Sequence, residues 1–327
     1  MNKHREIAEF NLIKHYFSAL TLARSDVQLG IGDDAALLKV PQDRVLAVSI
    51  DTLVSGVHFY SDVSPESLGH KALAVNLSDL AAMGAQPAWV TLALTLPEID
   101  EPWLSAFCRG FAKLATDHGV QLVGGDTTLG PLSITVQVHG FLPAGEGLRR
   151  SGAQVGDDIY VTGCLGDAAL ALHHIESRGA VDVLDIAYLK RRLERPEPRV
   201  EVGLALRQMA TSAIDISDGL LGDLTHILQS SGVGACLELE KLPLSRSVAD
   251  SLRKEDDWTR VVAGGDDYEL CFTLPEVDRI QIGELANRLG LPMTRIGYIE
   301  QKAGLRCFKR DGTLWVPERS GYQHFAS

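Results

Sequence analysis

The sequence predicts a protein of two mixed α/β domains, and three observations lead to this prediction. Its 327 residues exceed the usual length of one domain, which is about 100 to 200 residues. Runs typical of strands alternate with runs of helical periodicity along the chain. The small, turn-prone segment 143–147 interrupts this alternation. We therefore expect domains at residues 1–145 and 146–327.

The first half predicts an opening helix followed by alternating strands and helices. Residues 5–20 carry apolar side chains at near-helical spacing, and a loop rich in Gly and Asp follows at 30–34. Ser64–Pro65 is a typical helix start, and the apolar spacing after it predicts a helix over 65–83 that carries Asp79 near its end. The other expected elements are strands at 44–50, 89–96, 120–123 and 132–142 and a helix at 101–118.

The second half continues the mixed pattern. Residues 158–162 predict a strand and 166–177 a helix, whereas 191–199 contains two prolines and predicts a loop. A strand at 213–216 leads through Asp218–Gly219 into a helix that reaches Gln229. Further strands are expected at 235–239 and 269–274.

Charge and composition exclude several classes of function. The chain has 31 Lys and Arg against 43 Asp and Glu, a formal net charge of −12, which is the wrong sign for holding nucleic acid or an anionic membrane by bulk charge. We expect neither as a partner. The start of the chain lacks the apolar core of a secretory signal, and the uncharged stretch 80–97 is interrupted by Gly84 and Pro87, so it predicts a helix end, a turn and a buried strand. The 5 cysteines include no CxxC motif, so we expect a reducing cytoplasm and no zinc site.

Small residues followed by Asp recur at the ends of several predicted strands and loops. Glycine lets the backbone approach a ligand closely, and a carboxylate at a strand end projects from the rim of a sheet, where ligands bind. Hard oxygen ligands of this kind suit Mg²⁺, which takes its other ligands from water and phosphates. The motifs are Gly32–Asp33–Asp34, Ser49–Ile50–Asp51, Ser78–Asp79, Gly124–Gly125–Asp126, Asp215–Ile216–Ser217–Asp218–Gly219 and Gly264–Gly265–Asp266–Asp267.

Each motif alone is more typical of a turn or a helix cap than of a metal site. Their number favours a metal site, since several carboxylates gathered in one cleft repel one another unless cations neutralise them. The chain has no GxxxxGK[ST] loop, and residues 30–35 lack the last glycine of GxGxxG. A phosphate-handling enzyme with this sequence would therefore depend on metals.

The order and the residues of these motifs resemble those of the thiamine-monophosphate kinase family along essentially the whole chain. The segments that carry the resemblance are 9–13 (EFNLI), 29–36 (LGIGDDAA), 51–59 (DTLVSGVHF), 71–87 (KALAVNLSDLAAMGAQP), 124–128 (GGDTT), 214–220 (IDISDGL), 264–270 (GGDDYEL) and 321–325 (GYQHF). The resemblance implies transfer of the γ-phosphoryl group of ATP to the phosphate of thiamine monophosphate, which gives thiamine diphosphate, the last step of its biosynthesis. Transfer would be direct and in-line, with no phospho-enzyme, because the acceptor is already an ionised phosphate oxygen.

The resemblance also implies a fold and an assembly. The fold is that of the ATP-binding superfamily shared with aminoimidazole ribonucleotide synthetase and selenophosphate synthetase. In it, an N-terminal α/β domain binds ATP and Mg²⁺ and pairs across a two-fold axis through its sheet. A C-terminal α+β domain closes the active site. We therefore expect a cytoplasmic homodimer.

Carried over by motif, the resemblance implies three sets of site residues. The Mg²⁺ ligands would be Asp34, Ser49, Ile50, Asp51, Asp79, Asp126, Asp215 and Asp218. The ATP contacts would be Gly125, Asp126, Arg150 and Ser217. The thiamine monophosphate contacts would be His58, Asp266 and Tyr322. A carboxylate and an aromatic ring suit a cationic heterocycle.

The chain departs from the family pattern at two of these positions. Ile50 stands where the family often has Thr, so any ligand oxygen there must be the backbone carbonyl. Asp266 stands where the family commonly has Glu, and its reach is one methylene shorter. Three other roles have ordinary structural alternatives: Arg150 as a solvated charge, His58 as a structural histidine and Tyr322 as a packing residue.

Two other functions compete with this interpretation. One is another ATP-dependent enzyme of the same superfamily that acts on a different acceptor. The other is a catalytically idle Mg-nucleotide binding module that senses thiamine status. The segments around His58 and Tyr322 favour a thiamine phosphate acceptor, and the presence of every metal-bearing Asp disfavours the idle module.

Overall fold

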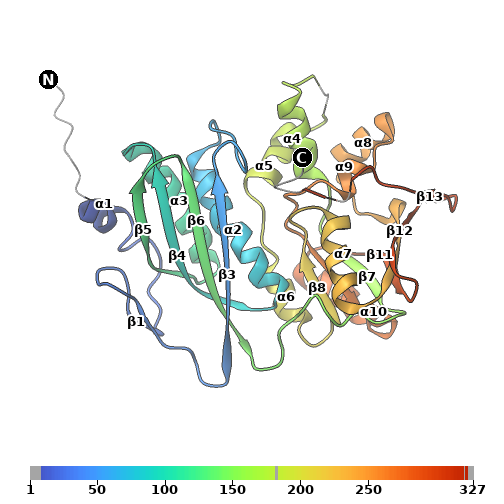
Figure 1. Cartoon of the computed structure of the whole chain (residues 1–327), viewed down its shortest axis with the longest axis horizontal. Helices are drawn as coiled ribbons and strands as arrows, with labels where there is room; N and C mark the ends of the chain where they lie inside the picture. Colours follow the sequence, from blue (N-terminus) through green and yellow to red (C-terminus); the bar gives the residue numbers. More distant parts are fainter. Residues whose placement is uncertain (1–8, 181–182, 320, 323–327) are drawn as a thin grey trace. The chain divides into compact units, whose positions relative to one another are not determined.

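The computed structural model describes residues 9–180, 183–319 and 321–322, and it divides the chain into two compact units. Unit 1 comprises residues 1–80 and 86–144, and unit 2 comprises residues 81–85 and 145–327 (Figure 1). Each unit has its own sheet and its own buried core. No helix in the described part of the chain is long and apolar enough to cross a membrane.

Unit 1 contains a four-stranded sheet and two long helices. Its elements are α1 (Glu9–Tyr16), β1 (Val27–Leu29), β2 (Leu37–Leu38), β3 (Arg44–Val54), α2 (Pro65–Ala82), β4 (Gln86–Leu96), α3 (Glu101–Asp117), β5 (Gln121–Leu129) and β6 (Ser133–Pro143). The strand order is β3-β6-β4-β5, with β6 antiparallel to both neighbours and β4 parallel to β5. The strands β3 and β5 are therefore the two edges of this sheet.

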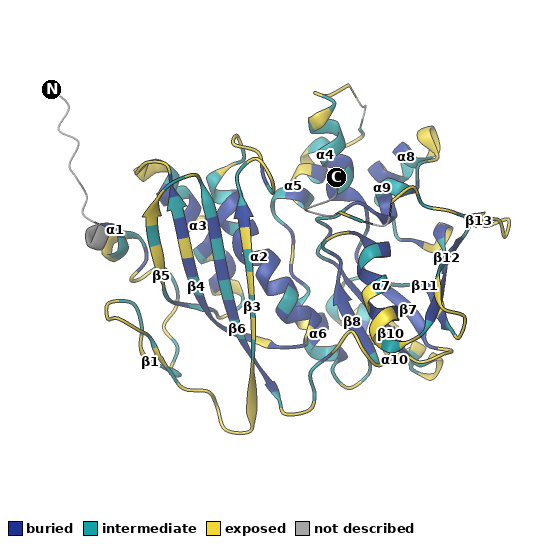
Figure 2. Cartoon of the chain, in the orientation of Figure 1, coloured by how far each residue is buried: buried dark blue, intermediate teal, exposed yellow. Residues whose placement is uncertain are grey.

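The two faces of the unit 1 sheet differ in burial. Along β6, the residues Ile134, Val136 and Val138 are at most 1% exposed and alternate with half-buried polar residues. The apolar side chains of α2 and α3, such as Leu73 and Phe107, are fully buried and complete this core. On the other face of β3, Val48, Ile50 and Thr52 are exposed. Figure 2 shows exposed stretches along β3. One face thus packs against helices, and the other carries exposed apolar side chains.

The helices α2 and α3 approach each other through two glycines. A Cβ atom at Gly69 would lie 2.0 Å from the carbonyl oxygen of Phe107, and one at Gly110 would lie 1.8 Å from that of Glu66. Both distances are far below contact, so the backbones themselves touch at this crossing. This close packing fixes the position of α2, which carries Asp79.

We expect Gly110→Ala to lower the free energy of unfolding by about 1–3 kcal/mol, because the added methyl group forces α2 and α3 apart. Gly283→Ala is the matched control: this glycine also lies in a helix, α10 (Arg279–Leu289), but has open space around its Cβ position. The control should be neutral or stabilising by about 0.5–1 kcal/mol. Urea denaturation measures both, and equal stability of the two variants would contradict the close helix packing.

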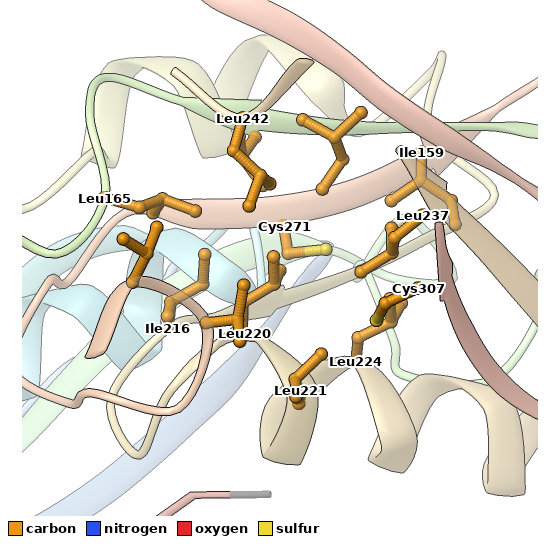
Figure 3. Close-up of a cluster of buried hydrophobic side chains, with 14 of the residues drawn as sticks. Ile159, Leu165, Ile216, Leu220, Leu221, Leu224, Leu237, Leu242, Cys271 and Cys307 are labelled. Atoms are coloured by element: carbon orange, nitrogen blue, oxygen red, sulfur yellow. The ribbon is translucent and has the colours of Figure 1, made fainter. Parts of the chain in front are cut away.

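Unit 2 has a seven-stranded sheet with helices. Its elements are β7 (Asp158–Thr162), α4 (Asp167–Glu176), α5 (Ile186–Glu194), α6 (Val200–Leu206), β8 (Ser212–Asp215), α7 (Leu220–Ser231), β9 (Gly234–Glu238), the 3₁₀ helix η1 (Leu239–Lys241), α8 (Arg246–Glu255), α9 (Thr259–Val262), β10 (Leu270–Leu274), η2 (Glu276–Asp278), α10, β11 (Met293–Glu300), β12 (Gly304–Phe308) and β13 (Leu314–Trp315). The order is β13-β12-β9-β11-β7-β10-β8, and only β12 and β9 pair in parallel. The core joins sheet residues such as Ile159 and Cys271 to Leu220 and Leu224 of α7 (Figure 3).

Most of the expected elements are confirmed, but four of them differ by four or more residues at one end. The helix expected at 5–20 ends at Tyr16, and its residues 5–8 lie outside the described part. The strand expected at 44–50 continues to Val54, and the one at 120–123 continues to Leu129. In the expected loop 191–199, the first four residues belong to α5. The apolar face of α5 is buried through Leu193, and the first proline of the stretch comes later, at position 196.

Candidate functional site

In unit 1, β3 and α2 bring Ser49, Asp51 and Asp79 together. The Ser49 hydroxyl donates a hydrogen bond of 2.5 Å to Oδ2 of Asp79, and Asp51 lies two residues further along the same face of β3. The Asp51 N–H donates to Oδ1 of the buried Asn76 at 3.1 Å, one turn before Asp79 on α2. The Asn76 amide in turn donates to the carbonyl of Ala72 at 3.0 Å, which fixes its orientation. Two carboxylates and a hydroxyl therefore converge between one strand and one helix.

The prediction that Asp51 and Asp126 end their strands is wrong. Asp51 lies inside β3 and pairs with Val136 of β6, and Asp126 lies inside β5 and pairs with Ala93 of β4. Both strands continue because each still has a neighbour that accepts its backbone hydrogen bonds. Within one chain the two carboxylates lie on opposite edges of the sheet, and three strand spacings of about 4.8 Å separate their Cα atoms by roughly 14 Å.

Gly125 and Ile50 have clear local positions beside these carboxylates. A Cβ atom at Gly125 would lie 1.8 Å from the carbonyl oxygen of Leu92, and its φ is 154°, so only glycine fits this close approach of β5 to β4. The Ile50 side chain is 57% exposed on the face opposite Ser49 and Asp51. Its side chain therefore does not face the carboxylates, and the backbone carbonyl is its only oxygen.

Asp34 and His58 lie in loops of unit 1. Asp34 is exposed between β1 and β2, and its N–H donates to Oδ1 of Asp33 at 2.9 Å. His58 follows β3, and its Nδ1 accepts the Val54 N–H at 3.0 Å, so a neutral ring carries its proton on Nε2. The half-buried ring is thereby held in one orientation.

In unit 2, Asp215 at the end of β8 and Ser217 and Asp218 in the loop after it lie close together in sequence. Asp215 ends the strand and is 5% exposed, whereas Ser217 is half-buried and Asp218 exposed. The N–H groups of residues 217, 218 and 219 all donate to Oδ2 of Asp223, at 3.0, 3.1 and 3.1 Å. Burial, together with the nearby Asp218 carboxylate, raises the pKa of Asp223 to about 7, although these three bonds act in the opposite direction.

The loop 264–269 packs against the loop after β8. The Asp266 N–H donates to the Ser217 carbonyl at 2.9 Å, and the Tyr268 N–H donates to that of Ile216 at 2.8 Å. Asp266 and Tyr268 have φ values of 68° and 49°, a left-handed conformation that is strained for residues with side chains. The Tyr322 N–H donates to the Asp218 carbonyl at 3.0 Å. The structure thus brings Ser217, Asp218, Asp266 and Tyr322 together, whereas Gln323, His324 and Phe325 lie outside the described residues.

Arg150 is the remaining expected site residue. Its side chain is exposed, and its carbonyl accepts a hydrogen bond of 3.3 Å from the Ser231 hydroxyl of α7. No contact recorded among the described residues joins its guanidinium to the loops above.

A buried charged network behind the loop 264–269 escaped the sequence analysis. The Glu269 carboxylate is 0% exposed and accepts hydrogen bonds from Arg192 at 2.7 Å, from Arg199 at 2.7 and 2.5 Å, and from Thr162 at 2.6 Å. Both oxygens of the neighbouring Asp267 face the Gly166 N–H at 3.0 and 3.1 Å, and burial raises the pKa of Asp267 well above its usual range. Asp267 and Glu269 lie in the segment GGDDYEL noted in the sequence, but the arginine-rich stretch 191–199 contains two prolines and predicts only a loop, so no local pattern pairs the two segments.

The donor set fits Mg²⁺ chemically. All donors are oxygens, and no group of three or more His, Cys, Asp or Glu in the described part of the chain forms a ready cage for a metal ion. Mg²⁺ is ordinarily held by one or two carboxylates, with water and substrate phosphates as its remaining ligands. Pairs such as Asp51 with Asp79 match that mode of binding.

Comparisons with known proteins agree with this architecture. The description "AIR synthase related protein, N-terminal domain" matches residues 32–142, and the corresponding C-terminal domain matches residues 154–309. The chain is 50% identical to the thiamine-monophosphate kinase of Escherichia coli strain K12 over 320 residues, which cover 98% of each chain.

Solved structures give the same result. A crystal structure of thiamine-monophosphate kinase from Stenotrophomonas maltophilia K279a superposes with a TM-score of 0.86 at 50% identity, covering 93% of this chain and 97% of the other. A structure described as AaThiL complexed with AMPPCP and TMP superposes with a TM-score of 0.75 at 30% identity over 99% of both chains. The two-domain fold expected from the sequence is thereby confirmed.

Proposed function

Because this chain belongs to the thiamine-monophosphate kinase family, we propose that it transfers the γ-phosphoryl group of ATP directly to the phosphate of thiamine monophosphate. It is an ATP-dependent kinase, and its product is thiamine diphosphate. The observation that carries this conclusion is 50% identity to a curated member over 98% of both chains. The related structure that holds an ATP analogue and TMP supports ATP and thiamine monophosphate as the two substrates here.

The chemistry demands charge compensation more than proton transfer. Both reactants are anions, and charge spreads over the oxygens of the moving phosphoryl group, so catalysis depends on positioning and electrostatic stabilisation. Asp51 and Asp79, with Ser49, would hold Mg²⁺ on unit 1, and Asp215 and Asp218 would do so on unit 2. Bound Mg²⁺ offsets the negative charge of the phosphates. No general base is required, because the acceptor oxygen is already ionised.

The chain's own residues have separable roles in binding. Gly125 would contact the nucleotide through its backbone on β5, and Arg150 offers an exposed guanidinium to phosphate oxygens. Asp266 and Tyr322, both fixed by backbone hydrogen bonds to the loop after β8, would bind the cationic thiamine ring by charge and by a cation–π contact. His58 would present Nε2–H as a donor.

We also propose a homodimer formed by the unit 1 sheet. Its edge strands β3 and β5 have no further neighbour among the described strands, and Val48 and Ile50 on β3 are 49% and 57% exposed. A closed eight-stranded arrangement, in which β3 of each copy pairs with β5 of the other, covers both edges. It also places the strand of Asp51 beside the strand of Asp126 of the partner subunit, which brings together two residues that one chain holds far apart.

We expect the wild-type protein to sediment at about twice its chain mass of 35.4 kDa, and Val48→Lys to shift it to the monomer. The lysine is tolerated in a single chain because position 48 is already half exposed, but it places a charge against the second copy. Val277→Lys is the control, since Val277 is 82% exposed on η2 of unit 2. A dimeric Val48→Lys variant in sedimentation equilibrium would rule out this interface.

We place the protein in the cytoplasm. The cysteines Cys108, Cys164, Cys236, Cys271 and Cys307 are all free, and four of them are buried. Thiols of this kind persist in a reducing compartment.

ATP turnover with and without acceptor separates this function from its alternatives. The proposed kinase consumes ATP only when thiamine monophosphate is present. An enzyme for another acceptor would leave ATP unchanged under these conditions unless its own substrate were added. A sensor module would bind Mg-ATP without turning it over in either case.

A further inference from the structure

Asp223 on the first turn of α7 occupies an unusual position. Its carboxylate is 3% exposed, and a single oxygen accepts three consecutive backbone N–H groups, those of Ser217, Asp218 and Gly219. Three amides that point at one spot at the start of a helix form a concave site suited to an anion. In this chain a carboxyl oxygen of the protein itself, Oδ2 of Asp223, occupies the site.

The loop that Asp223 holds is connected to every candidate site residue of unit 2 except Arg150. It contains Ser217 and Asp218 and follows directly on Asp215. Two of its carbonyls accept hydrogen bonds from other candidate site residues: that of Ser217 from the Asp266 N–H at 2.9 Å, and that of Asp218 from the Tyr322 N–H at 3.0 Å. The loop therefore forms hydrogen bonds to Asp223 with its N–H groups and to the thiamine-binding candidates with its C=O groups.

The surrounding backbone leaves this loop little alternative space. A Cβ atom at Gly219 would lie 2.9 Å from the backbone of Ala263, and one at Gly265 would lie 2.5 Å from the Ser217 carbonyl oxygen. The two loops are thus in direct backbone contact. A shift of residues 217–219 must therefore displace Asp266 as well.

From this geometry we infer that Asp223 is a positioning residue. By accepting the three amides it fixes the conformation of the loop that presents Asp218 to metal and nucleotide. Through the carbonyls of Ser217 and Asp218, this loop in turn positions the backbone of Asp266 and Tyr322. The inference rests on the proposed function for the identity of the substrates. One consequence is that the amides of residues 217–219, just before α7, do not bind a substrate phosphate, because Asp223 already accepts their hydrogen bonds. Another is that a single side chain away from the reacting atoms controls the binding of both substrates.

The test compares Asp223→Ala with Asp223→Asn. Alanine removes the acceptor, whereas asparagine can place its carbonyl oxygen where Oδ2 now lies. Asp157→Ala is the matched control for lost stability, because Asp157 is also a buried carboxylate in unit 2 that accepts a backbone N–H, from Gln154 at 2.9 Å, and a hydroxyl, from Thr211 at 2.6 Å. Steady-state kinetics give KM for ATP and for thiamine monophosphate, and binding of a fluorescent ADP analogue with Mg²⁺ is measured without any acceptor.

We expect Asp223→Ala to raise both KM values about tenfold or more and to weaken nucleotide binding similarly, because a displacement of about 1 Å at a substrate-positioning group is felt strongly. Asp223→Asn should stay within about threefold of wild type. Asp157→Ala should lower Tm while leaving both KM values unchanged. KM values for Asp223→Ala that match those of Asp157→Ala, or an Asp223→Asn variant as impaired as Asp223→Ala, would overturn the inference.

Two further measurements keep the test decisive. If Asp223→Ala does not fold, Asp223→Ser replaces it, since its hydroxyl falls one bond short of the amides. In the wild-type protein, the amides of residues 217–219 should exchange slowly with solvent, and fast exchange at all three would contradict the inference without any variant. Failure of the wild type to form thiamine diphosphate would instead count against the proposed function. It would leave the inference about Asp223 testable, because nucleotide binding and amide exchange can be measured without formation of this product.

Discussion

Asp51→Asn is expected to lower kcat/KM for the kinase reaction by about 10³-fold while leaving the fold intact. The substitution removes a negative charge and one hard oxygen at the place where Ser49, Asp51 and Asp79 converge. Stabilisation of developing charge by a fixed electrostatic partner is worth about this factor in other enzymes. Stability should be unchanged or slightly higher, since the change also removes repulsion between two carboxylates.

The matched control for Asp51→Asn is Asp62→Asn, because Asp62 is an exposed aspartate of unit 1 outside every site motif. Initial rates at rising Mg²⁺ concentration, together with thermal unfolding, separate a metal defect from a folding defect. Asp62→Asn should behave as wild type. Near-normal kcat in Asp51→Asn would remove Asp51 from the assigned site.

Glu269→Gln has the largest expected effect on stability, a loss of about 3–5 kcal/mol in the free energy of unfolding. The Glu269 side chain is completely buried, and it compensates Arg192 and Arg199, whose side chains are each only 11% exposed. Glutamine keeps the size but removes the charge, so two guanidinium groups remain buried without their shared carboxylate. The penalty is the desolvation of those charges, which water cannot relieve in a closed core.

Glu300→Gln is the control for Glu269→Gln. Its carboxylate also pairs with an arginine, Arg306 at 2.5 Å, but the two side chains are 25% and 17% exposed. Solvent screens this pair, so we expect a loss of at most about 1 kcal/mol. Denaturant unfolding of both variants measures the difference. Similar losses in the free energy of unfolding would mean that the buried Glu269 network stabilises the fold no more than the partly exposed Glu300–Arg306 pair.

Local signals predicted the elements that contain strong patterns. The strand 158–162 coincides with β7, because it is a short run of β-prone residues, and the helix expected at 65–83 ends within one residue of α2, because Ser64–Pro65 is a clear start signal. The motifs with Gly and Asp also marked the loops at 215–219 and 264–269, which the structure places in contact. Residues with unusual backbone geometry stand out in a sequence because few residue types tolerate it.

Long-range pairing decided what the sequence could not predict. The ends of β3 and β5 depend on hydrogen bonds with β6 and β4, which no local pattern around Asp51 or Asp126 reveals. The Glu269 network joins residues 70 and 77 positions apart in the chain, so the arginine-rich stretch 191–199 with its two prolines indicates locally only a loop. Asp223 was missed for a similar reason, since an acidic residue in the first turn of a helix is common and its three amide contacts exist only in the folded loop.

The assigned function depends most directly on the identity of the phosphoryl acceptor. The decisive measurement incubates the protein with ATP and Mg²⁺ and then with thiamine monophosphate, free thiamine or no acceptor, and quantifies thiamine diphosphate itself. We expect thiamine diphosphate from the monophosphate alone, with one ADP formed for each product molecule. ATP binding without any thiamine diphosphate, or equal product from free thiamine, would contradict the assigned function.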